Sequence, residues 1–115
     1  MTDTCKLLIG RNGEGLISTI GVDVPIAIKS KEGRYTVYCP SFQTFGYSLT
    51  SEDDAIEDFK KSLGVFFKVH LFRETLEEAL VKFGWEQCET VSSYKGAPSK
   101  FPTERAFEHQ YAMVA

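Results

Sequence analysis

The densest group of chemically reactive side chains is a run of carboxylates at residues 52–58, EDDAIED. Paired carboxylates can hold a metal ion or act as acid and base in catalysis. Glu52, Asp53 and Asp54 are adjacent, however, and adjacent positions of a helix point in different directions. Carboxylates are also favoured at the start of a helix, where the helix dipole stabilises negative charge. We therefore interpret the run, including Glu57, as a charged helix start.

The histidines and cysteines do not form a recognisable catalytic or metal-binding set. His70 and His109 have no Ser, Cys or acid at a spacing that is typical of a catalytic dyad. Cys39 has no local base, and Cys5, Cys39 and Cys88 are too widely spaced to suggest a zinc site. The sequence therefore predicts a protein that is not an enzyme and that uses no metal or other cofactor.

Four aromatic residues, Tyr38, Phe42, Phe45 and Tyr47, precede the acidic run. Aromatic side chains on a sheet can stack on the bases of single-stranded RNA, but this mode normally includes Lys or Arg for the phosphates. Residues 35–59 contain neither Lys nor Arg. We expect no direct nucleic-acid binding and interpret the aromatics as core residues and partner contacts, with a single-stranded RNA-binding module as the alternative.

The composition describes an acidic globular protein. The chain of 115 residues has a formal net charge of −3 and a pI near 5.4, which is compatible with a basic protein partner. No apolar stretch approaches the length of a membrane span, so no membrane association is expected. The odd number of cysteines and an N-terminus without the features of a signal peptide predict a cytoplasmic protein with reduced thiols.

Alternating apolar residues predict several β-strands in the first half of the chain. Residues 24–29 and 34–39 form the clearest hairpin, and residues 42–49 suit a third short strand. The glycine-rich N-terminal part, residues 5–21, reads as a strand, a turn and a second strand. Pro25 suits the start or the edge of a strand, because proline cannot donate to a strand ladder.

A long helix is predicted from about residue 51 to about residue 71. Thr50, followed by an acid three residues later, forms a capping-box-like start, and the apolar residues after it recur with the helical period. The second half of this helix, residues 65–72 with the sequence VFFKVHLF, is apolar nearly all round. A helix of this kind must be covered on more than one side, so we expect the chain to form a homo-oligomer.

A second, short helix is expected between a cap at Thr75 and a terminating Gly84, with Trp85 packing back on its last turn. Residues 88–94 alternate and suit a final strand, whereas residues 95–115 form a C-terminal extension that is compatible with either helix or strand. Together these elements predict a single α+β domain over residues 1–115. Its antiparallel sheet follows the order β-β-β-α-α-β, with one long and one short helix on one face.

Residues 22–86 resemble the HicB-like antitoxin family. The resemblance rests on a strand that ends in Cys-Pro, a glycine before the acidic helix, a threonine and an alanine at its start, and a Gly-Trp pair after the second helix. In this sequence these positions are Cys39-Pro40, Gly46, Thr50, Ala55 and Gly84-Trp85.

The resemblance implies a partial RNase H-like fold and an antitoxin that binds a small basic HicA-type toxin. Toxins of that type cleave mRNA, and the antitoxin would mask the active site. Candidate partner-binding residues are aromatic or acidic: Tyr38, Phe42, Phe45, Tyr47, Glu52, Asp53 and Glu57. A solitary HicB-like protein with another protein partner is the remaining alternative.

Overall fold

The computed structural model describes residues 5–88, 93–96 and 105–112. These residues form an antiparallel sheet and two helices, so the predicted α+β class is confirmed. In chain order the elements are β1 (Lys6–Arg11), β2 (Ile17–Lys31), β3 (Arg34–Cys39), β4 (Thr44–Ser48), α1 (Glu52–Phe72), α2 (Leu76–Lys82), β5 (Glu86–Gln87), β6 (Ser93–Lys95) and β7 (Arg105–Ala112). The predicted β-β-β-α-α-β order is incomplete, because further strands precede and follow it.

The central element is β2, a single strand of 15 residues where two shorter strands were expected. Its first half pairs with β1, its second half pairs with β3, and β7 pairs with its middle on the edge opposite β1. Pro25 therefore lies inside a long strand, not at its start. The pairing with β1 ends at Asp23, so the edge of β2 that faces β1 has no partner strand at Pro25.

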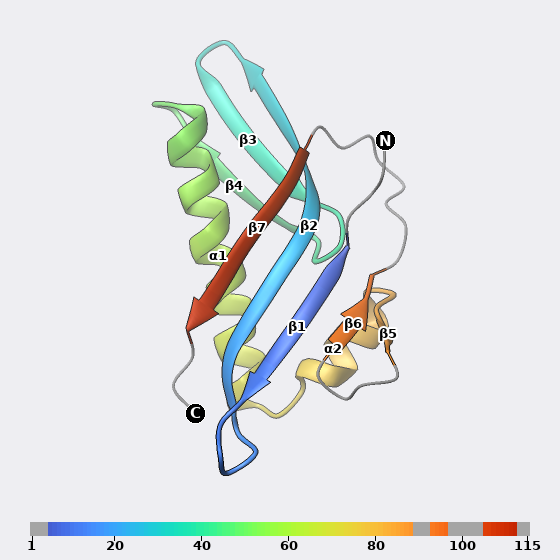
Figure 1. Cartoon of the computed structure of the whole chain (residues 1–115). Helices are drawn as coiled ribbons and strands as arrows, with labels where there is room; N and C mark the ends of the chain where they lie inside the picture. Colours follow the sequence, from blue (N-terminus) through green and yellow to red (C-terminus); the bar gives the residue numbers. More distant parts are fainter. Residues whose placement is uncertain (1–4, 89–92, 97–104, 113–115) are drawn as a thin grey trace.

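The core lies between the sheet and α1, which crosses one face of the strands (Figure 1). Alternate residues of β2 from Ile20 to Ile28 are buried on that face. Phe59 and Phe67 of α1 contact Phe107 and Tyr111 of β7, with ring centroids 4.9 and 5.5 Å apart. Helix α1 is thus held by apolar contacts with strands from both ends of the chain.

The predicted bounds of α1 agree with the structure to within one residue. The cap is Ser51 instead of the expected Thr50, because the Ser51 hydroxyl accepts a hydrogen bond of 3.1 Å from the Asp54 amide. The acidic first turn then lies at the positive end of the helix dipole, as the sequence indicated.

The second helix ends as predicted but begins differently. Gly84 has a φ of 89°, and the Trp85 amide donates to the Leu80 carbonyl at 2.9 Å. Thr75, expected to cap the helix with its side chain, instead places its hydroxyl 2.7 Å from Nδ1 of His70. The indole of Trp85 is buried and donates to the Ser41 carbonyl, so α2 docks through the residue that follows it.

The C-terminal part contributes more of the sheet than its sequence indicates. The sequence leaves residues 105–112 between helix and strand, whereas the structure forms β7 there and pairs it along β2. Part of the strand expected at 88–94 is present as β6, although residues 89–92 lie outside the described residues. No helix among the described residues is long and apolar enough to cross a bilayer.

The three cysteines, Cys5, Cys39 and Cys88, are reduced thiols in different environments. Cys39, at the end of β3, is fully buried, and this burial raises the pKa of its thiol to about 12. Cys88 is exposed. Since the thiolate is the reactive form, the two residues should differ strongly in reactivity.

We expect a colorimetric thiol reagent at neutral pH to modify Cys88 rapidly and Cys39 only after the protein is unfolded by denaturant. The Cys88→Ser variant should lose the fast phase, and the Cys39→Ser variant should keep it. Modification of Cys39 in the folded protein at the rate of Cys88 would contradict the buried position of Cys39.

Candidate partner-binding surface

Three of the four aromatics lie together on the outer face of β2, β3 and β4, the face turned away from α1. The register places Tyr38 of β3 opposite Phe45 of β4, and Tyr47 opposite Thr36. Phe45 and Tyr47 remain 61% and 47% exposed. Paired residues of an antiparallel sheet point to the same side, so the three rings form one aromatic surface.

Gly46, between Phe45 and Tyr47, explains why these two rings face outward. It points to the inner side of β4, where the backbone of α1 at Ala55 and Phe59 lies directly against it. A shift of β4 by one residue would turn Phe45 or Tyr47 into this contact, where a side chain has no room. The close approach of α1 to β4 therefore fixes the direction of the aromatic surface.

Phe42 does not belong to this surface, which corrects the expectation that it contacts a partner. The turn between β3 and β4 carries it to the inner side, where its side chain is only 1% exposed. Its ring centroid lies 5.7, 5.4 and 5.0 Å from those of Phe66, Phe67 and Trp85. The sequence cannot distinguish this ring from its neighbours, because its burial depends on residues more than twenty positions away.

The predicted acids divide between different sides of α1. Glu52 and Asp53 are in the first turn, with Glu52 partly buried and Asp53 exposed. Glu57 lies 3.5 Å from Nζ of Lys60 and on the side that faces β7. Desolvation and the nearby Lys60 lower the pKa of His109 in β7, while Glu57 acts in the opposite direction. Glu57 is thus separated from the edge of β4.

Asp58 is the acid that the structure brings to the aromatic surface. Its carboxylate accepts a hydrogen bond of 2.9 Å from the Tyr47 amide at the outer edge of β4. Edge strands leave such amides unpaired, and a carboxylate there discourages pairing with a further strand. Asp54 lies one turn earlier on the same side of α1 and is exposed. Asp54 and Asp58 therefore replace Glu57 as the acids beside the aromatic surface.

The structure also brings cations to this surface. Lys29 of β2 pairs with Thr36, which in turn pairs with Tyr47, and Lys31 pairs with Arg34 at the tip of the hairpin. Residues 35–59 contain no Lys or Arg, but in the folded protein the cations of β2 lie close to their aromatic side chains. Both signs of charge flank the aromatics, with carboxylates at the edge of β4 and cations across β2.

The described part of the chain places no metal-binding cluster beside the aromatic surface, and the groove that the structure shows lies elsewhere. Among residues 5–88, 93–96 and 105–112, no group of three His, Cys, Asp or Glu side chains could hold a metal ion. A groove of about 810 Å³ lies elsewhere, between the β1–β2 turn and the junction of the two helices. Because Phe45 and Tyr47 are exposed, the aromatic surface suits contact with a macromolecule.

Comparison of the chain with models of known protein families, with curated proteins and with solved structures gives no match. The HicB-like resemblance therefore rests on the sequence motif alone.

Proposed function

We propose that this protein is a HicB-like antitoxin with a partial RNase H-like fold, and that it neutralises a small basic HicA-type toxin by covering the active site for mRNA cleavage. The observation that carries the proposal is the exposed pair Phe45 and Tyr47 on an edge strand, with Asp54 and Asp58 of α1 beside it. Exposed aromatics at the centre of an interface supply contact energy, and neighbouring carboxylates complement a basic partner.

The residues that carry the family resemblance have compatible structural positions. Gly46 and Ala55 meet where α1 crosses β4, and Gly84 and Trp85 end and anchor α2. Gly46 and Ala55 thus support β4 from below the aromatic surface. The Gly46–Ala55 contact keeps Phe45 and Tyr47 directed outward. The residues of the family motif therefore hold the aromatic rings in a position where a partner can reach them, which supports the proposed role of this surface in binding.

The test is binding of a purified, catalytically inactive HicA-type toxin, measured by isothermal titration calorimetry. We expect the double variant Phe45→Ala, Tyr47→Ala to raise the dissociation constant by about 100-fold or more, because truncation of aromatic anchors typically removes several kcal/mol. Asp54→Lys should weaken binding by roughly tenfold through charge repulsion.

Glu57→Lys supplies the matched control, because it reverses the same charge on the side of α1 that faces β7. Its effect should be much smaller than that of Asp54→Lys. Equal affinities of the wild type and the double aromatic variant, with each variant folded by circular dichroism, would exclude the proposed surface. No binding to any HicA-type toxin would exclude the antitoxin function.

The row of Lys29, Thr36 and Tyr47 favours a second candidate, binding of single-stranded RNA. This row places a cation beside an aromatic ring, which is the combination that single-strand binders use. Lys29→Glu distinguishes the two candidates: it should weaken RNA binding strongly and leave binding of a basic toxin unchanged or improved. RNA affinity must also fall steeply with salt, because phosphate contacts release counterions.

A further inference from the structure

The groove of about 810 Å³ opens where three segments far apart in the sequence meet. Its walls come from the β1–β2 turn, the C-terminal end of α1 and the start of α2, which lie near one another at one end of the molecule (Figure 1). The volume is within the range of sites that bind small organic molecules. The groove is distinct from the aromatic surface, because Tyr38, Phe45 and Tyr47 do not line it.

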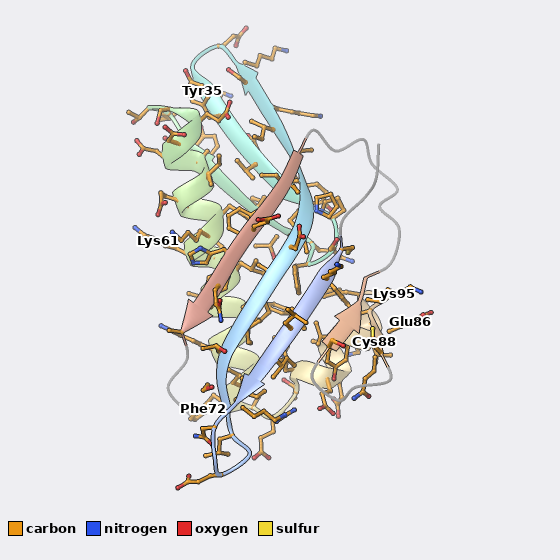
Figure 2. The ribbon with its side chains drawn as sticks, in the orientation of Figure 1. Tyr35, Lys61, Phe72, Glu86, Cys88 and Lys95 are labelled. Carbon is orange, nitrogen blue, oxygen red and sulfur yellow. The ribbon has the colours of Figure 1, made fainter. Side chains whose placement is uncertain are left out.

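The groove has apolar side chains that are open to solvent. Phe72, at the end of α1 in Figure 2, is 90% exposed, and Leu16 of the β1–β2 turn is 48% exposed. The half-buried Leu71 and the buried Leu76 also line the groove. The turn holds Leu16 in place, because its amide donates to Oδ1 of Asn12 at 3.1 Å and its carbonyl accepts from the Asn12 amide at 2.8 Å. Apolar surface of this kind can bind the hydrocarbon part of a ligand.

The charged side chains of the groove are mainly acidic. Glu74, Glu77 and Glu78 lie at the start of α2, and all three are exposed. The first-turn position of such acids stabilises the helix, but it also lines one wall of the groove with carboxylates. Arg11 and Lys68 are the cations of the lining, and in the described part of the chain neither forms an ion pair with these acids. The acids outnumber the cations, so the groove favours a positively charged ligand.

One of the acids is partly offset by a cation. Burial raises the pKa of Tyr94, Glu77 raises it further, and Arg11 lowers it, so both of these charges lie near Tyr94. Nη1 of Arg11 also donates to the Gly15 carbonyl at 3.2 Å. The net negative charge of the lining therefore comes chiefly from the other two acids, Glu74 and Glu78.

The connection between α1 and α2 holds these acids near Phe72. Nδ1 of His70 lies 2.7 Å from Oγ1 of Thr75, and the Thr75 amide donates to the His70 carbonyl at 2.9 Å. Thr75 is thus bound to the end of α1 through both its side chain and its backbone. Glu74 lies directly before Thr75, and its amide donates to the Leu71 carbonyl at 3.2 Å. The groove is therefore largely formed before a ligand binds, which lowers the cost of binding.

We propose that this groove binds a small organic cation, a molecule with an apolar body and one primary amino group. The apolar body contacts Phe72 and Leu16, where aromatic and aliphatic surface is exposed. The ammonium group faces Glu74 and Glu78 and forms charge-assisted hydrogen bonds with their carboxylates. A neutral ligand of the same shape loses these bonds, and an anionic ligand meets the negative wall of α2.

Three compounds with one skeleton test this chemistry: phenylbutylamine, phenylbutanol and phenylbutyrate. Dissociation constants are measured from NMR chemical-shift changes in the isotope-labelled full chain. We expect the amine to bind about tenfold more tightly than the alcohol, because bonds to charged groups are the stronger ones, and the carboxylate to bind most weakly. The shifted amides should include those of Leu16 and Glu74. No binding of the amine, or binding of the carboxylate as tight as that of the amine, would overturn the proposal.

A double variant locates the ammonium group. Glu74→Gln combined with Glu78→Gln should raise the dissociation constant of phenylbutylamine by about tenfold and leave that of phenylbutanol unchanged. Glu86→Gln combined with Glu108→Gln is the matched control, because it removes the same charge from exposed positions that do not line the groove. Equal effects of the two double variants on the amine would overturn the assignment of its charge to Glu74 and Glu78.

A second pair of variants tests the apolar part of the site. Phe72→Ser should weaken the binding of phenylbutylamine and phenylbutanol alike, by roughly tenfold, because both ligands lose the same aromatic contact. Val81→Ser is the control, since Val81 is an exposed apolar residue of α2 that does not line the groove. Circular dichroism checks that each variant is folded. Equal affinities of the Phe72→Ser and Val81→Ser variants for both ligands would overturn the proposed position of the apolar body.

Discussion

Replacing Gly46 by alanine is expected to destabilise the fold by about 3 kcal/mol or more, at the upper end of the usual effect of overpacking a core. An added Cβ would overlap the backbone of Ala55 and Phe59 in α1. Backbone atoms in the middle of a helix cannot move aside as the end of a flexible side chain can. To relieve the overlap, α1 must separate from β4, which would disturb the core contacts that α1 makes with β7.

Urea denaturation measures this loss directly, and a fall of about 10 °C or more in the thermal midpoint should accompany it. Gly13→Ala is the matched control, because a Cβ at Gly13 meets no atom within 4 Å. The control should change the stability by less than about 0.5 kcal/mol. If Gly46→Ala is as stable as Gly13→Ala, the close crossing of α1 over β4 is wrong.

The second large effect is expected for Phe42→Ala, with a loss of about 3–5 kcal/mol in the free energy of unfolding. The ring of Phe42 is buried among Phe66, Phe67 and Trp85, so its removal leaves a cavity between β4, α1 and the residue that anchors α2. A loss of this size is a large part of the total stability of a domain of this length.

Phe45→Ala is the appropriate comparison, because it removes the same side chain from an exposed position three residues away. We expect its free energy of unfolding to stay within about 0.5 kcal/mol of the wild type. The two variants should therefore have different defects. Phe42→Ala should lower the free energy of unfolding, whereas Phe45→Ala should weaken partner binding in a protein that remains stable. Equal stabilities of the two variants would contradict the assignment of Phe42 to the core.

Features that depend on neighbouring residues could be predicted from the sequence. The acidic start and the helical period located α1 to within one residue, although the cap moved from Thr50 to Ser51. The turn at Gly33 and the end of α2 at Gly84 follow from glycines that adopt a positive φ. Helix capping and tight turns involve residues a few positions apart, so their physical causes lie within a short stretch of sequence.

Features that depend on distant partners could not be predicted in the same way. β7 has a sequence compatible with helix or strand, and its pairing with β2 decides the outcome because the paired strand satisfies its backbone and buries Phe107 and Tyr111. The continuity of β2 through Pro25 has the same origin, since strands on both of its edges support different parts of it. Propensity is overridden here by tertiary contacts.

The sequence by itself determined the α+β class, the long acidic-ended helix and the presence of aromatics before it. The tertiary structure alone decided which aromatics are available: Phe42 is in the core, while Phe45 and Tyr47 face outward because Gly46 must face α1. It also decided that Lys29 lies in the same row as Tyr47 and that Asp58 lies at the edge of β4. Strand register and helix crossing bring these residues together, and both are set by packing between segments far apart in the chain.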